Sequence, residues 1–213
     1  LFVDLNKYYL DYDTQPSEIQ KSSTIIGSKI ITDKHAELIL KWINRMDVKD
    51  ELKIQYELNL LLRGSRDGFK SGRFHELCDN KTHTLTIIKI KGGDEILGGY
   101  NPIEWNNLKS FSLPFYNTKE SFIFSFKGKE NIENCILSRV KDVNYAIKHW
   151  FYSGPSFGQT DLNINGIFFN QCNCSCKKNS YEKEIRETED YFSIEEYEVF
   201  QVKKKINKMY NNM

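Results

Sequence analysis

Short segments with strand-like patterning, separated by glycine-rich turns, limit what this chain can fold into. In residues 54–62, apolar side chains stand at every second position, with Leu61 as the one addition, which is typical of a half-buried strand. Residues 84–90 are rich in β-branched side chains, and Gly92-Gly93-Asp94 after them has the composition of a tight hairpin turn. Further strands are predicted at 95–100, 121–126, 135–140, 146–151, 161–164 and 194–202.

Few helices interrupt these strands. Apolar residues recur at helical spacing from Thr32 or Asp33 to about Arg45, and residues 69–78 predict a second, short helix. Because the helices do not alternate regularly with strands, a doubly wound α/β fold is disfavoured. The pattern predicts a mainly β (α+β) fold, a two-sheet antiparallel β-sandwich flanked by a few helices.

The domain boundaries follow from composition. Residues 1–21 mix aromatic and acidic side chains without a clear period and are predicted to be a linker or leading strand, with residues 22–31 extended. Residues 22–203 form the predicted domain, and 204–213 a flexible, basic tail.

Charge and hydropathy exclude several classes of function. The chain has 213 residues, with 30 basic and 29 acidic side chains and a net charge of +1, whereas a dedicated nucleic-acid binder normally carries a basic excess. No apolar run approaches the roughly 20 residues that span a bilayer, and the N-terminal residues do not form a secretory signal. We therefore expect a cytoplasmic chain with reduced thiols, no nucleic-acid partner and no membrane insertion.

A charged turn at 63–68 is the first candidate site. Arg63, Arg66 and Asp67 lie among glycines directly after a predicted strand. They form either a salt-bridged turn that contacts a partner, or a structural turn in which Asp67 caps the next helix and an arginine braces the backbone.

Two turns with aromatic residues are the second candidate site. One contains Tyr100, Asn101 and Trp105, and the other is the segment Gly154-Pro155-Ser156-Phe157-Gly158. Aromatic side chains in such loops are either anchors of a protein interface or plugs that close the ends of the sandwich.

The cysteines offer a different chemistry. Cys172, Cys174 and Cys176 share one face if their segment is extended. Thiols at this spacing do not converge on a metal as a two-residue gap does, so we predict no metal site. A redox role requires exposed thiols of low pKa. His75 and Cys78 do not suggest a nucleophile–base pair, because they project in parallel from one short helix and have no orienting third group.

Several motifs, in order along 22–203, resemble the TLDc domain in the form found in fungal proteins that join it to a BTB domain. The matching segments are Ile25-Ile26, Trp42-Ile43, the turn 63–68, Gly98-Gly99-Tyr100 with Trp105, the strand 121–126, the turn 154–162 and the closing segment 192–200. The last departs from the family pattern, with Phe200 in place of the usual tryptophan.

The resemblance implies a β-sandwich and a role in protection against oxidative stress. It also implies binding to peripheral subunits of the vacuolar-type proton ATPase, and an upstream BTB domain, outside this chain, through which the protein self-associates. It establishes no reaction. We expect a non-enzymatic interaction module without a cofactor. The alternative is a thiol-dependent antioxidant enzyme or redox sensor that uses Cys172, Cys174 or Cys176.

Overall fold

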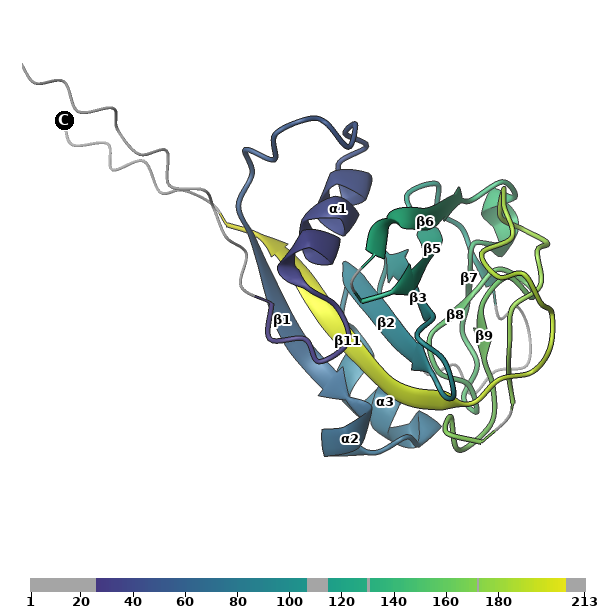
Figure 1. Ribbon diagram of the computed structural model, residues 1–213. Coiled ribbons are helices and arrows are strands. Elements are labelled where there is room, and N and C mark those ends of the chain that lie inside the picture. The colour runs from purple at the N-terminus through teal and green to yellow at the C-terminus, as the bar shows by residue number, and fades with distance from the viewer. Residues whose placement is uncertain (1–25, 107–114, 130, 172, 206–213) are drawn as a thin grey trace, which may run out of the picture.

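A six-stranded antiparallel sheet forms the centre of the molecule (Figure 1). The computed structural model describes residues 26–106, 115–129, 131–171 and 173–205. The last strand lies between the first and second strands, which ties the C-terminal part of the chain into the sheet. In spatial order the strands are β1 (Tyr56–Arg63), β11 (Ile194–Lys204), β2 (Thr84–Ile90), β3 (Ile96–Asn101), β5 (Phe122–Gly128) and β6 (Asn131–Arg139).

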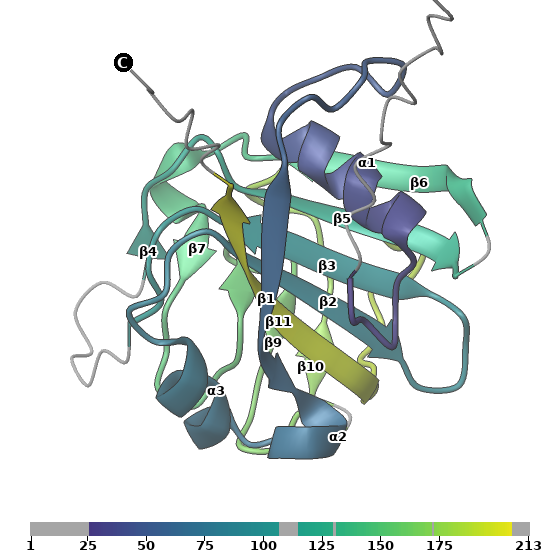
Figure 2. The same ribbon diagram turned by 90° about the vertical axis from the view of Figure 1, so that its left-hand side faces the viewer.

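Smaller sheets form a second layer. One contains β4 (Phe115–Tyr116), β7 (Ile147–Lys148) and β8 (Ser156–Phe157), and the other pairs β9 (Asn163–Ile164) with β10 (Cys174–Ser175). They lie against one face of the large sheet, whereas the helix α1 (Asp33–Ile43) crosses the other face (Figures 1 and 2). The predicted mainly β sandwich with antiparallel sheets and flanking helices is confirmed.

The alternation of side chains along each strand builds a core on both faces of the large sheet. In β5, Phe124 and Phe126 point toward α1, where Trp42 packs on their rings at centroid distances of 5.6 and 5.7 Å. Ile123, which precedes Phe124 and points to the opposite face of the strand, belongs to the core under the small sheets. In β11, likewise, Phe200 belongs to the core under α1 and Val199 to the core under the small sheets. The period of two residues therefore places apolar side chains in two separate cores.

The helices end where the backbone leaves the right-handed region. The helix α1 stops at Ile43, two residues before the predicted end, because Arg45 adopts a left-handed φ of 55°. Two helices replace the predicted turn and single helix: α2 (Gly64–Asp67) and α3 (Ser71–Cys78). Gly68 separates them with a φ of 96°, which favours glycine. None of the helices among the described residues is long and apolar enough to cross a membrane.

The predicted edges of several segments are wrong. The strand predicted at 146–151 is only two residues long, because the short 3-10 helix η1 (Val143–Tyr145) precedes it and a turn follows. Residues 28–31 bend rather than extend, since the Ser28 hydroxyl accepts the N–H groups of Ile30 and Ile31. The predicted tail begins too early, because Lys204 is part of β11. The segments 1–21 and 206–213 lie outside the described residues.

Candidate functional site

Arg63 is a structural residue at the end of β1. Its Nε donates to the Glu198 carboxylate at 2.6 Å, and its guanidinium also donates to the Gly27 carbonyl. The buried Glu198 carboxylate further accepts the Lys29 N–H at 3.0 Å and the Ser28 hydroxyl. Arg63 and Glu198 therefore fasten the segment before α1 to β1 and β11.

Asp67 braces the charged turn but does not cap α3. Its carboxylate accepts the backbone N–H of Arg63 at 2.9 Å and pairs with the half-exposed Arg66 at 2.8 Å. The hydrogen bond from Arg66 lowers the pKa of Asp67. The residue at the N-cap of α3 is Lys70, without a side-chain bond. The predicted bracing arginine is confirmed, whereas the predicted helix cap is wrong, because Gly68 turns the chain away before α3 begins.

The predicted aromatic turn is the end of β3 and the residues after it, and its side chains pack into the interior. Tyr100, Asn101 and Trp105 are all buried. The indole N–H of Trp105 donates to the Thr84 hydroxyl at 2.7 Å, and Asn101 accepts the Ile103 N–H at 3.1 Å. Trp105 packs in the core between the sheets and Tyr100 in the core under α1, so neither side chain is an exposed anchor.

The second turn is also internal, and its motif has a structural explanation. Gly154, Pro155, Phe157 and Gly158 are buried. Gly158 has a φ of 68°, and a Cβ there would lie 1.9 Å from a carboxylate oxygen of Asp161. That buried carboxylate accepts the backbone N–H groups of residues 179–181 at 2.8 to 2.9 Å. The motif therefore holds a distant loop in place.

The described cysteines are poor nucleophiles. Cys174 and Cys176 are buried, and Cys176 donates to the Asp161 carbonyl at 2.8 Å. Burial raises the pKa of Cys176 to about 12 and also raises the pKa of Cys78. Cys172 lies outside the described residues. No group of histidine, cysteine and acidic side chains in the described part of the chain could hold a metal ion.

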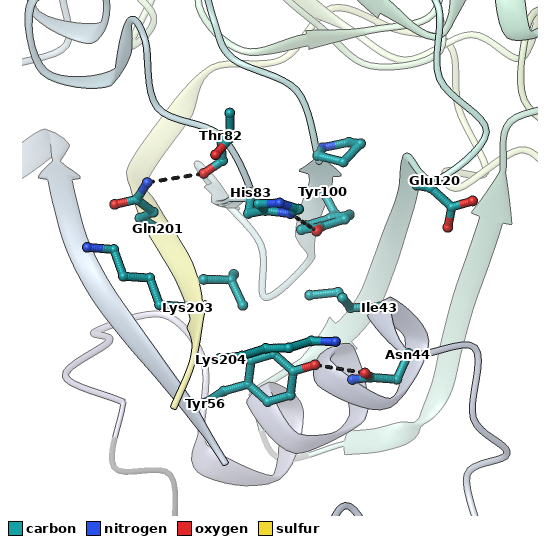
Figure 3. Close-up of a pocket in the computed structure, with 12 residues that line it drawn as sticks. Ile43, Asn44, Tyr56, Thr82, His83, Tyr100, Glu120, Gln201, Lys203 and Lys204 are labelled. Carbon is teal, nitrogen blue, oxygen red and sulfur yellow. Dashed lines mark hydrogen bonds between the residues drawn. The ribbon is translucent and has the colours of Figure 1, made fainter. Parts of the chain in front are cut away.

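A pocket that the sequence did not predict lies between the end of α1 and the ends of β1 and β11 (Figure 3). Its volume is about 630 Å³. Two side-chain hydrogen bonds join residues that line it. The Tyr56 hydroxyl donates to Asn44 at 2.7 Å, and the hydroxyl of Tyr100 lies 2.7 Å from Nδ1 of His83. Lys204 reaches across it toward Asn44, at the C-terminal end of α1. The C-terminal end of a helix carries partial negative charge. The end of α1 therefore already offsets part of the positive charge of Lys204 in this pocket.

A second feature is an exposed apolar surface beside α3. Phe151, Tyr152, Ile167 and Phe168 are 38%, 53%, 54% and 39% exposed, and we call these four residues the loop surface. They come from two chain segments that are bridged at Ser153 and Asn165. The sequence pointed to the neighbouring turn at 154–158 instead, because glycine and proline signal a turn more strongly than two aromatic residues signal exposure.

The two segments of the loop surface are anchored to α3. The Ser71 N–H donates to the Ile167 carbonyl at 3.1 Å, and Nε2 of His75 lies 3.2 Å from the Trp150 carbonyl. The ring of His75 also stacks on Phe151 at 6.4 Å. The apolar side chains are thus held on a defined backbone.

Comparison with known proteins agrees with the motifs. The model of the TLDc domain matches residues 25–203, which includes every described strand and helix except the last residue of β11. The comparison with curated proteins found no match.

Proposed function

Because this chain belongs to the TLDc domain family, we propose that it is a non-enzymatic protein-interaction module that helps to protect cells against oxidative stress. We further propose that its partners are the peripheral subunits of the vacuolar-type proton ATPase, which the family resemblance suggests. The predicted upstream BTB domain and the cytoplasmic location stay predictions.

The loop surface is the observation that supports the proposal. Large apolar side chains exposed together commonly mark a protein interface, and aromatic residues dominate the energetics of such interfaces. The backbone under these side chains is fixed by hydrogen bonds to α3. Binding to a fixed surface costs less conformational entropy than binding to one that must first become ordered.

The thiol-dependent alternative has less support. Cys174 and Cys176 are buried and belong to the core under the small sheets. A nucleophilic cysteine needs exposure and a lowered pKa, whereas burial raises the pKa of Cys176.

A pull-down with matched variants tests the proposal. The domain is immobilised and incubated with a lysate that contains the proton ATPase, and bound subunits are quantified by mass spectrometry. The double variant Tyr152→Ala/Ile167→Ala should lose most of the captured subunits. The control Val48→Ala/Ile54→Ala removes two exposed apolar side chains elsewhere and should bind normally. Recovery of no proton-ATPase subunit by the wild-type domain would show that the partner is wrong.

A further inference from the structure

A partly buried lysine, Lys148, lies next to the loop surface. The side chain of Lys148 lines a pocket of about 450 Å³, together with Phe115, Trp150 and Tyr152. Lys148 pairs with Phe115 across the β4–β7 ladder, so the two side chains lie on the same face. Tyr152 belongs both to this pocket and to the loop surface, which makes the two features continuous.

The environment of Lys148 is unfavourable for a cation in the free domain. Its side chain is partly buried, and burial lowers its pKa. No acidic group among the described residues lies within ion-pair distance of its ammonium group. Charges that lose water are normally paired, so an anion that fills this pocket would restore a missing interaction.

The neighbouring charges favour an acidic partner as well. The Lys70 ammonium group lies 5.4 Å from the centre of the Phe168 ring. Two acids at the end of α3 already have partners, since Glu76 pairs with Arg73 and the Asp79 carboxylate lies 2.9 Å from Nδ1 of His75. A second lysine, Lys70, therefore lies beside the loop surface, and the carboxylates of Glu76 and Asp79 already have partners within the chain.

We propose that Lys148 is the charge-recognition point of the loop surface and binds a carboxylate side chain of the protein partner. Apolar side chains next to that carboxylate in the partner then pack on Phe151, Tyr152, Ile167 and Phe168. The partner segment is thus acidic and apolar, rather than basic. This inference rests on the proposed function, because it names the chemistry of the partner at the same surface.

A small probe tests the charge requirement without any knowledge of the partner. Phenylacetate carries a carboxylate next to an aromatic ring, and phenylacetamide has the same shape without the charge. Each is titrated into the isotope-labelled full chain, and amide shifts are followed by NMR. Phenylacetate should shift the signals of Lys148, Tyr152 and Gly166 in a saturable manner, with an affinity roughly tenfold above that of phenylacetamide, the difference expected for one charge-assisted contact.

Two variants make the result specific. Lys148→Met keeps the apolar stem and removes the charge, and it should bring phenylacetate down to the affinity of phenylacetamide. Lys34→Met, on the exposed side of α1, removes a cation elsewhere and should leave both affinities unchanged. Equal binding of the two probes to the wild-type chain, or unchanged phenylacetate binding by Lys148→Met, overturns the inference.

The pull-down separates this inference from the proposed function. If Tyr152→Ala/Ile167→Ala loses the partner and Lys148→Met binds it normally, the inference is wrong and the function stands. If the wild-type domain recovers no proton-ATPase subunit although phenylacetate binds at Lys148, the partner is wrong and the anion-binding pocket stands.

Discussion

Glu198 shows how one residue connects distant parts of this chain. Its carboxylate is buried in β11, yet it bonds to Arg63 at the end of β1 and to the backbone of Lys29 before α1. A buried charge is tolerated only when such partners surround it. The arginine at the start of the charged turn 63–68 therefore has a structural explanation, because Arg63 pairs with the buried Glu198 carboxylate.

Removal of the Glu198 carboxylate should strongly destabilise the fold. Glu198→Ala leaves the Arg63 guanidinium and the Lys29 N–H without their acceptor, and we expect a loss of about 3–5 kcal/mol in the free energy of unfolding. Urea denaturation measures it. Glu187→Ala is the control, since Glu187 forms an exposed pair with Lys127, and exposed pairs contribute little. Equal midpoints for the two variants would contradict the structural role of Glu198.

His149 predicts a pH dependence of stability. It is buried between Trp105 and Tyr116, and neither ring nitrogen has a hydrogen-bond partner among the described residues. Burial, with a smaller effect of His75, lowers its pKa from the ordinary 6.5 to about 4. Between these two pH values the unfolded chain binds a proton that the folded chain does not, so stability falls as the pH falls from 6.5 to 4.

The variant His149→Phe isolates this effect. Phenylalanine keeps a ring between the same two neighbours and has no proton to bind. The wild-type chain should lose about 3 kcal/mol more than the variant between pH 6.5 and pH 4, since one pKa unit corresponds to about 1.4 kcal/mol. Thermal or urea unfolding at several pH values measures the difference. Parallel stability curves for the two proteins would exclude a buried, neutral His149.

At the scale of elements, β3 has two glycines at the positions where aromatic rings pack directly on its backbone. A Cβ at Gly98 would lie 2.3 Å from the Phe124 ring and 2.5 Å from the Thr86 carbonyl oxygen, and one at Gly99 would lie 2.5 Å from the Phe157 ring. The two glycines of the Gly98-Gly99-Tyr100 motif thus allow a ring to cover each face of the strand.

Alanine at Gly98 should therefore destabilise the central sheet. The added methyl group meets backbone as well as a packed ring, so overpacking of about 1–3 kcal/mol is expected. Gly93→Ala is the matched control, because nothing lies closer than 4.0 Å to its Cβ position. Unfolding in urea should show a lower midpoint for Gly98→Ala alone. A stable Gly98→Ala variant would mean that Phe124 does not lie against β3.

The elements that the sequence predicts well are those with long, regular patterns. The helical spacing in α1 and the alternation in β1 extend over several residues, so their positions were predicted within two residues. Strands such as β7, β8 and β9 have two residues each. A two-residue strand has no detectable period, and its pairing partners determine its existence.

The surface features were harder to predict, because their signals come from tertiary contacts. The exposure of Phe151 and Tyr152 depends on a turn that ends β7 early and on contacts with α3. That Lys148 has no ion pair among the described residues depends on where the other elements place their acids. By contrast, the buried Trp105 and Phe157 follow the general tendency of large apolar side chains to fill the core.

At the scale of the whole molecule, the two cores share one structural element. The core under α1 contains Trp42, and the core under the small sheets contains Cys78, Cys174 and Cys176. The large sheet separates them, and each of its strands β2, β5 and β11 contributes side chains to both. Loss of the sheet removes both cores at once, so we expect one cooperative unfolding transition.

Thiol labelling tests this cooperativity and the redox alternative together. The native chain is treated with iodoacetamide at increasing urea concentrations, and each cysteine is quantified by mass spectrometry. Cys78, Cys174 and Cys176 should stay unmodified until the urea midpoint reported by tryptophan fluorescence, because their burial protects them until the sheet opens. The partly exposed Cys135 is the internal control and should react at lower urea. Labelling of Cys174 or Cys176 without urea would contradict the buried positions and restore the thiol-dependent mechanism, since a reactive cysteine must be accessible in the folded state.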